Sequence, residues 1–436
     1  MKQFRSFLEN PGKSDRVEFS QNISSSKSSS NSVWPIEKWL IGKLMVLAGN
    51  PQIRVRFWDG QIHYPEPDVE TGPILTVTNR RTFWHFFLNP NLHFGDGYSL
   101  GTLTCPDDEL KELLEAIYHA HVLKMRPGPI LSFINRGLTR LKKNTIARSK
   151  ENIHHHYDLG NDFYRLWLDS DLTYTCAYFE RPDMNLEEAQ LAKMDHVCKK
   201  LALKPGETVV EAGCGWGGFA RHMALNYGVK VRSYNISREQ IGFAKERARK
   251  EGFDDRVEYV LDDYRNIKGT NYDVFVSIGM LEHVGAENYG VLGQVIDRVL
   301  SPDGRGLIHS IGKNRPEPSG SWTLKRLFPG GYSPCLREIM EIFEGPCFSV
   351  IDVENLRLHY AQTLDHWLER YENHIEWVRE HFDEFFVRAW RLYLAGSSAN
   401  FSTGCLQLFQ VLFTRPTKND QPWTRAEIYR DGKALN

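Results

Sequence analysis

A glycine-rich segment at residues 210–218 constrains this 436-residue chain more than any other feature. It reads Val-Glu-Ala-Gly-Cys-Gly-Trp-Gly-Gly, follows an apolar run and precedes a stretch with helical spacing. A strand, a tight turn through Gly213, Gly215 and Gly217, and a helix N-terminus together let the backbone approach a ligand closely. Because nucleotide sites and S-adenosylmethionine sites share such a loop, the loop alone leaves the ligand open.

The chain around this loop alternates between predicted strands and predicted helices. Strands are predicted at residues 208–211, 230–234, 257–261, 272–278 and 306–311, and helices between them at 219–226, 237–250 and 289–300. This order predicts an α/β fold, a doubly wound, mostly parallel and Rossmann-like sheet that binds ligands at the carboxyl ends of its strands. A long amphipathic helical region at 360–395 and a late strand at 407–413 follow.

The length predicts two folded domains. Residues 1–32 are polar and serine-rich, so we expect a disordered tail. Residues 33–123 predict a small α+β domain with a lipid or membrane role: 53–58 alternate and meet Asp59-Gly60, a hairpin signal, 74–78 predict a strand and 107–120 a helix. A basic linker (124–150), a catalytic domain (151–415) and a C-terminal tail (416–436) complete the expected organisation.

The composition excludes several classes of protein. Lys and Arg (54) nearly balance Asp and Glu (55), so no global field draws the chain to nucleic acid. The seven cysteines are an odd number and form no CxxC pair, which indicates reduced, cytosolic thiols. No run of 18 apolar residues and no secretory h-region is present, so we expect a cytoplasmic protein.

The segment at 124–150 carries eight basic residues and no Asp or Glu. Its apolar residues recur at helical spacing, as in a basic amphipathic helix that lies on an anionic membrane. A solvated connector helix that packs its apolar side on the core would show the same pattern. Both interpretations remain open from the residues alone.

Three further motifs accompany the glycine loop. Residues 174–179 read Tyr-Thr-Cys-Ala-Tyr-Phe, 279–285 read Gly-Met-Leu-Glu-His-Val-Gly, and 308–312 read Ile-His-Ser-Ile-Gly. Together with the loop they resemble the cyclopropane fatty acid synthase and mycolic acid cyclopropane synthase family, from about residue 150 to about 415. The resemblance implies a class I methyltransferase fold, S-adenosylmethionine as cofactor, and transfer of a methylene group to a cis double bond of an unsaturated phospholipid.

The residue after the second predicted strand argues against a nicotinamide cofactor. Such sites usually place Asp or Glu there, about 20 residues after the glycines, whereas this chain has Asn235. The family usually has Thr at this position, so Asn235 departs from it while keeping a donor and an acceptor. By resemblance, the other cofactor contacts are Tyr174, Thr175, Glu211, Gln240, Asp263 and Tyr264, besides the three glycines of the loop.

The chemistry implied by the resemblance needs a base that the cofactor does not alkylate. Methyl transfer to an alkene leaves a carbocation, which aromatic faces can stabilise, and closing the ring then removes a proton. The family uses a bound bicarbonate ion for this step. By resemblance its ligands are Cys176, Glu282, His309, Tyr360 and the backbone of Ile311.

Each of these residues also has an ordinary structural interpretation. Cys176 alone would be a small buried hydrophobe and His309 a satisfied core histidine, but the shared family spacing favours catalysis. Adjacent side chains such as those of residues 154–156, three histidines, do not converge on one ion, so we expect no metal. Ser397 and Ser402 depart from the Cys and Arg common in relatives, which puts a direct catalytic role at 397 in doubt.

Three alternative functions follow from the same residues. The product could instead be a methylene- or methyl-branched acyl chain, the substrate could be a small molecule, or the protein could be a lipid binder with a decayed site. The intact glycine loop and Glu282 argue against the last of these. The expected partners are unsaturated phospholipids on the inner face of the membrane, where the protein would associate peripherally, with a homodimer allowed and no nucleic acid.

Overall fold

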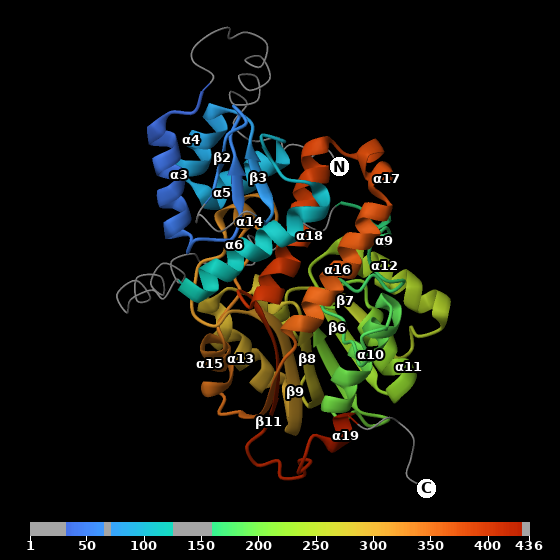
Figure 1. The fold of residues 1–436 in the computed structure, drawn as a ribbon. Helices are drawn as coiled ribbons and strands as arrows, with labels where there is room; N and C mark the ends of the chain where they lie inside the picture. The colour runs from blue at the N-terminus through green and yellow to red at the C-terminus, as the bar shows by residue number, and fades with distance from the viewer. Residues whose placement is uncertain (1–31, 65–70, 125–158, 430–436) are drawn as a thin grey trace.

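The computed structural model describes residues 32–64, 71–124 and 159–429, and the statements below refer to these residues (Figure 1). The expected disordered tail up to residue 31, the basic segment from 125 to 150 and the histidines at 154–156 lie outside the described residues.

A seven-stranded sheet organises the larger part of the molecule. Its strands, in chain order, are β5 (Thr208–Ala212), β6 (Lys230–Asn235), β7 (Val257–Leu261), β8 (Tyr272–Ile278), β9 (Leu300–Gly312), β10 (Ser349–Asn355) and β11 (Gln407–Thr414). The spatial order is β10-β11-β9-β8-β5-β6-β7; β5 to β9 pair in parallel, and β11 is antiparallel to both of its neighbours. The predicted doubly wound, mostly parallel sheet is confirmed.

Helices cover both faces of this sheet, as strand alternation requires. Val209 packs with α10 (Leu186–Lys200), α11 (Gly218–Tyr227) and α12 (Arg238–Glu251). Its neighbour Val210 points the other way and packs with α13 (Tyr289–Val299) and α15 (Leu336–Glu344). The chain crosses from β7 to β8 on the far side of β5, and at such a switch point a crevice opens at the strand ends.

Side-chain caps set several helix boundaries near the site. Asn185 and Glu188 form a capping box at the start of α10, and the Ser237 hydroxyl accepts from the backbone N–H of Gln240 in α12. The helical region expected at 360–395 is confirmed and comprises three helices. The chain forms α16 (Arg357–Asn373), α17 (Ile375–His381) and α18 (Glu384–Thr403), because Phe382 is extended and Asp383 caps a new helix.

The N-terminal part contains a four-stranded sheet of order β2-β1-β3-β4. Its elements are α3 (Pro35–Leu47), β1 (Arg54–Arg56), β2 (Ile62–His63), β3 (Ile74–Val77), α4 (Arg80–Leu88), α5 (Pro90–Ser99), β4 (Leu103–Thr104) and α6 (Leu110–Lys124). The predicted hairpin is the antiparallel β1–β2 pair. The helix predicted from residue 107 begins at Leu110, after a 3₁₀ turn at Asp107–Glu109.

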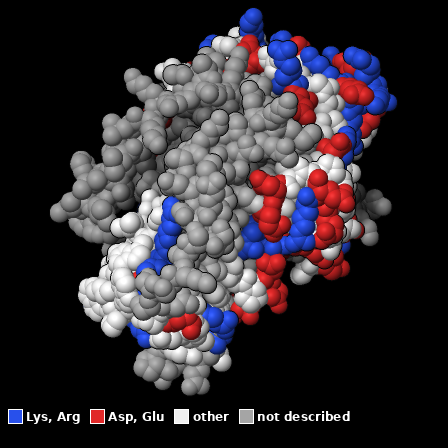
Figure 2. Space-filling model, turned by 90° about the horizontal axis from the view of Figure 1, so that it is seen from above, with Lys and Arg blue, Asp and Glu red and all other residues white. Residues whose placement is uncertain are grey.

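Ion pairs and packing join this part to the helices above the larger sheet. Lys111 lies 2.6 Å from Asp365 of α16, and Arg326 lies 2.9 Å from Asp96 of α5. α5 and α6 pack along α18, as Figure 1 shows. In the view from above, Lys and Arg side chains intermingle with Asp and Glu side chains on the right-hand part of the visible face (Figure 2).

Candidate active site

The glycine loop turns the chain from β5 into α11. Gly213, Gly215 and Gly217 have φ of 91°, 52° and 81°, which favours glycine at each position. A Cβ atom at Gly217 would also lie 2.6 Å from the hydroxyl of Tyr259, which donates to the Gly217 carbonyl. The loop therefore depends on both conformational freedom and close approach, and it leaves Gly218, the first residue of α11, facing a cleft.

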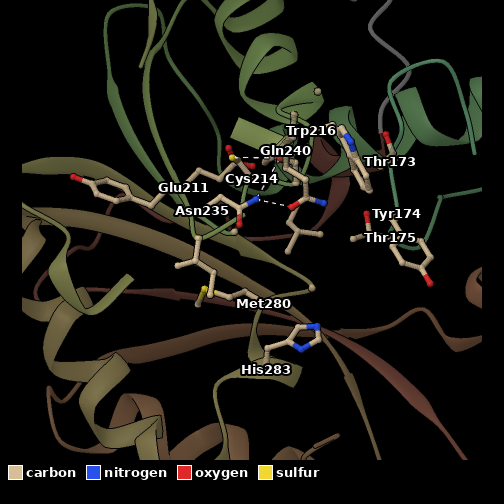
Figure 3. Close-up of a pocket in the computed structure, with 18 of the residues that line it drawn as sticks. Thr173, Tyr174, Thr175, Glu211, Cys214, Trp216, Asn235, Gln240, Met280 and His283 are labelled. Atoms are coloured by element: carbon tan, nitrogen blue, oxygen red, sulfur yellow. Dashed lines mark hydrogen bonds between the residues drawn. The ribbon is translucent and has the colours of Figure 1, made fainter. Parts of the chain in front are cut away.

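This cleft opens at the carboxyl ends of β5, β6 and β8 (Figure 3). Nine of the ten residues predicted to bind the cofactor line it: Tyr174, Thr175, Glu211, Gly213, Gly215, Asn235, Gln240, Asp263 and Tyr264. The tenth, Gly217, is the N-cap of α11 and is not part of the lining, although its neighbours Trp216 and Gly218 are. The structure thus gathers residues from four separate segments of the sequence around one cavity.

Asn235, at the end of β6, forms a pair of amides with Gln240. Its Nδ2 donates to Gln240 Oε1 at 2.8 Å, and its Oδ1 accepts from the backbone N–H of Ser237 at 3.2 Å. Figure 3 shows the two side chains joined in the cleft. An uncharged amide pair stands where a nicotinamide site would hold a carboxylate.

Glu211 is a buried carboxyl in the cleft wall. It is 3% exposed, and Oε2 accepts from the Ser233 hydroxyl at 2.5 Å. Burial raises the pKa of Glu211 to about 7, although the Ser233 hydrogen bond and the charge of Lys193 oppose the shift. Glu211 is therefore partly protonated at neutral pH, and it can both donate and accept.

Asp263 and Tyr264 follow β7 on the far wall. Arg265 holds both oxygens of Asp263, at 2.7 and 2.8 Å. The Tyr264 hydroxyl is buried with no hydrogen-bond partner among the described residues. Asp263 thus fixes its loop, and Tyr264 offers both a ring face and an unused hydroxyl to a ligand.

Two residues of α10 hold the Tyr174–Thr175 side of the cleft. The sequence did not indicate either of them as a site residue. Gln190 donates to the carbonyl of Thr175 at 2.9 Å, and Lys193 donates to the Thr175 hydroxyl at 3.0 Å. Lys193 is 1% exposed, and burial lowers its pKa to about 8. The sequence feature that could have indicated this role is the pair of polar residues Gln190 and Lys193, three positions apart on α10.

Aromatic side chains enclose the space behind Tyr174. The Tyr174 hydroxyl lies 2.7 Å from that of Tyr393, and its ring centroid lies 5.2 Å from Trp167 and 5.4 Å from Trp367. Trp216 of the glycine loop stacks obliquely on Tyr164 at 5.0 Å. Such a wall excludes water and presents ring faces that stabilise positive charge.

Glu282 lies in a 3₁₀ turn, Leu281–His283, just beyond β8. Its Oε1 accepts from the backbone N–H of Ile311 at 2.6 Å, whereas Oε2 is buried with no hydrogen-bond partner among the described residues. Burial raises the pKa of Glu282 to about 7. The structure therefore joins two predicted ligands of the anion, with the Ile311 amide already engaged by the carboxyl.

Cys176 and Tyr360 belong to one buried cluster with Ile311 at its edge. The Cys176 thiol donates to the carbonyl of Ala177 at 3.1 Å, and burial raises its pKa, so it stays protonated. The next amide, of Ala177, donates at 3.0 Å to Thr363, one turn from Tyr360 on α16. The ring of Tyr360 stacks on Phe401 with centroids 4.5 Å apart.

His309 lies within β9, paired with Ile278 of β8 and Gln410 of β11. It is 2% exposed, and burial lowers its pKa to about 3. Its carbonyl accepts from the N–H of Gly279, a residue of the cleft wall, at 2.9 Å. None of the five predicted anion ligands lines the cleft itself, but Thr175 and His283, the sequence neighbours of Cys176 and Glu282, do.

The two departures from the family lie on α18. Ser402 donates to Glu115 of α6 at 2.7 Å, so it contributes to the junction with the N-terminal part. Ser397 is half-buried. Among the described residues, no group of His, Cys, Asp and Glu side chains has the arrangement of a metal site. In that same part of the chain, no helix combines the length and the apolar character needed to cross a bilayer.

Comparison with known proteins identifies relatives. The sequence model of the family "Mycolic acid cyclopropane synthetase" matches residues 144–411. A "Probable fatty acid methyltransferase" of Pseudomonas putida is 40% identical over 64% of this chain and 74% of its own length. The cyclopropane-fatty-acyl-phospholipid synthase of Escherichia coli K12 is 36% identical over 79% of this chain and 88% of its own.

A solved structure agrees with these sequence matches. Mycolic acid cyclopropane synthase CmaA1, crystallised with SAH and CTAB, superposes with a TM-score of 0.58 at 32% identity, over 61% of this chain and 98% of that one.

Proposed function

Because the chain belongs to the mycolic acid cyclopropane synthetase family, we propose that it adds a methylene group from S-adenosylmethionine to a cis double bond of an unsaturated phospholipid acyl chain. The product is a cyclopropane fatty acyl chain. The name of the Escherichia coli relative supports a phospholipid substrate, and SAH in the CmaA1 structure supports the cofactor.

The observation that carries this proposal is the junction between the cleft and the buried acid. Gly279 of the cleft wall donates to the carbonyl of His309, and Glu282, three residues further on, accepts from Ile311. A cofactor in the cleft and a proton acceptor beside Glu282 would therefore both lie against the short segment from Gly279 to His283. An alkene needs both on adjacent sides, since it receives a methyl group and then loses a proton.

The residues of the cleft fit S-adenosylmethionine. The amides of Asn235 and Gln240 suit ribose hydroxyls, the ring of Tyr264 suits the adenine, and Tyr174 with Thr175 closes over the methionine end. The cofactor supplies a methyl group on a positively charged sulfur, which becomes the ring carbon. The glycine loop and the aromatic wall orient that methyl group and exclude water around it.

The buried cluster fits a small anion such as bicarbonate. The Cys176 thiol is protonated and the carboxyl of Glu282 is partly so, and Glu282 keeps one buried oxygen without a partner. Bicarbonate would supply a base that is not an alkylatable side chain. Cys176, Glu282, His309 and Tyr360 would hold it in place, while Tyr360 and its aromatic neighbours shield the developing positive charge.

Lipid analysis tests this function and its main alternative. The protein is expressed in a host that lacks such fatty acids, and lipids are analysed by mass spectrometry. We expect acyl chains heavier by about 14 mass units, one CH₂. Because the ring replaces the double bond, the product of a monounsaturated chain should take up no H₂ on catalytic hydrogenation. Uptake of one H₂ by the new species would assign a methylene-branched or methyl-branched alkene instead. No lipid change with purified unsaturated phospholipid would overturn the proposal.

Peripheral association with the inner face of the cytoplasmic membrane completes the proposal. Support comes from α3, which exposes Ile36 (49%), Trp39 (56%) and Leu47 (66%) on its outer side, next to Lys43. Tryptophan and lysine are residues that suit the headgroup boundary of an anionic bilayer. The basic segment around Arg140, Lys142 and Lys143 would add about 1 kcal/mol per charge at low salt.

Sedimentation with anionic vesicles tests the membrane surface. Replacing Trp39 and Leu47 with serine should weaken binding about tenfold or more through lost apolar burial, and leave cofactor affinity unchanged. Neutralising Arg140, Lys142 and Lys143 should weaken binding chiefly at low salt. The matched control is Trp423→Ser, a fully exposed tryptophan far along the chain. Unchanged binding of both variants would refute this part of the proposal.

A further inference from the structure

A chain of buried polar side chains reaches His309 from α10. Gln410 faces His309 across the antiparallel β9–β11 pair, with Gln410 Nε2 3.1 Å from His309 Nδ1. On the other side, Lys200 Nζ donates to Gln410 Oε1 at 2.8 Å. Each of the three side chains belongs to a residue that is no more than 5% exposed. The proposed reaction so far uses neither Lys200 nor Gln410.

The donor and acceptor roles along this chain follow from Lys200. An ammonium group only donates, so Gln410 must turn its carbonyl oxygen to Lys200 and its NH₂ group to His309. A ring nitrogen that accepts a hydrogen bond carries no proton, so Nδ1 of His309 is unprotonated. Because burial lowers the pKa of His309 to about 3, the ring is neutral at pH 7 and its single proton is on Nε2.

The carboxylate of Glu354 provides a counter-charge to Lys200, which donates to Gln410. Glu354 Oε2 lies 2.5 Å from Lys200 Nζ and 2.8 Å from His196 Nε2, and Tyr429 donates to Oε1 at 2.6 Å. Burial opposes ionisation, but the hydrogen bond from His196 and the charge of Lys200 hold the pKa of Glu354 far below its usual value. The resulting ion pair fixes the orientation of the Gln410 amide.

We infer that Lys200 and Gln410 are positioning residues that lock His309 in its Nε2–H tautomer, so that the ring presents a hydrogen-bond donor to an anion bound beside Glu282. The other tautomer would present a lone pair, which repels an anion. The catalytic half of this inference rests on the proposed function. The tautomer itself does not, because it follows from the hydrogen bonds alone.

Nuclear magnetic resonance of ¹⁵N-histidine protein tests the tautomer directly. Long-range ¹H–¹⁵N spectra at pH 8 distinguish Nε2–H from Nδ1–H, and the signals missing from His309→Gln assign the residue. We expect Nε2–H in the wild type. Gln410→Glu replaces the donor by an acceptor, so we expect Nδ1–H in that variant. An Nδ1–H wild type, or any other pattern in Gln410→Glu, overturns the inference. If that variant does not fold, Gln410→Met should show a mixture of both tautomers.

Kinetics then test whether the tautomer matters. Gln410→Glu should lower turnover about 100-fold and leave cofactor affinity unchanged, as expected for a misoriented acid–base group. The control, Gln52→Glu, makes the same change on an exposed side chain of the N-terminal part and should alter neither quantity. A switched tautomer with normal turnover refutes the catalytic half. A wild type that forms no modified lipid instead refutes the proposed function, while the spectra still report the tautomer.

Discussion

The cofactor cleft and the cluster around Glu282 meet along the segment from Gly279 to His283, and they are built from different atoms. The cleft is open and is shaped by a glycine loop and an amide pair. The cluster is buried and consists of ionisable groups moved towards their neutral forms, as Glu282 and His309 show. The difference indicates that ligand binding and proton transfer depend on separate residues, so substitutions should affect one and leave the other intact.

Glu282→Gln should produce the largest separation. The amide keeps the size of the side chain but cannot supply or take up a proton, so turnover should fall at least about 100-fold while cofactor affinity is unchanged. Turnover assays and calorimetry measure the two effects. Glu258→Gln, at an exposed ion pair on β7, is the control and should behave as wild type. For the wild type, removing bicarbonate from the buffer should slow the reaction. Normal turnover in Glu282→Gln would mean that the base lies elsewhere.

Gly213→Ala should show the opposite pattern. Gly213 has a φ of 91°, and a Cβ atom would lie 3.0 Å from that of Met280, so the loop must move. Strain of about 1–3 kcal/mol predicts cofactor binding weaker by about 10- to 100-fold, with turnover at saturating cofactor much less affected. Gly60→Ala is the control, because Gly60 has a φ of 86° with nothing within 4 Å. If Gly213→Ala lowered turnover and left cofactor binding unchanged, the proposed separation between the cleft and the cluster would be wrong.

Asn235→Asp tests whether the cleft depends on the uncharged amide pair of Asn235 and Gln240. Aspartate cannot donate to Gln240 Oε1, and its charge would face that oxygen, so S-adenosylmethionine binding should weaken about fivefold. Calorimetry of the wild type should show S-adenosylmethionine and its demethylated product binding, and no tight binding of NADH. A variant that binds S-adenosylmethionine more tightly than the wild type would contradict the role given to the amide pair.

Glu211 lies in the cleft but, like Glu282 in the cluster, it is a buried carboxyl with a raised pKa. Its effect should appear in the pH dependence of the free energy of unfolding. Its pKa is raised to about 7 in the folded protein, against an ordinary value of 4.5. The folded state therefore binds this proton more tightly, and its stabilising contribution is full below pH 4.5 and lost as the pH rises to 7, by up to about 1.4 kcal/mol per unit. Denaturant midpoints should fall less steeply over this window in Glu211→Gln than in the wild type. Parallel curves would show that Glu211 is ionised at neutral pH.

The sequence predicted those elements whose apolar pattern is simple. β5 and β8, at the centre of the sheet, are buried on both faces and read as apolar runs, so the position of the cleft followed. β10 was not predicted, because Ile351 and its neighbours are only partly buried. α3 was missed as well, since it carries apolar residues on its buried and exposed sides alike.

The site residues divide in the same way. Gly213 and Glu282 stand in short motifs whose local order carries the information. Lys193, Lys200 and Gln410 do not, because a lysine on a helix normally faces water. Only the folded structure shows their partners in the interior: Lys193 donates to Thr175, and Lys200 donates to Gln410 of β11.

The position of β11 also has a consequence for biosynthesis. It is the last described strand in the chain, yet it lies between β9 and β10. On the ribosome, the glycine loop and its neighbouring strands emerge long before the place between β9 and β10 can be filled, which leaves two bare strand edges on the nascent chain. A polypeptide released before residue 407 would carry every segment of the cofactor cleft but lack Gln410, the residue that faces His309.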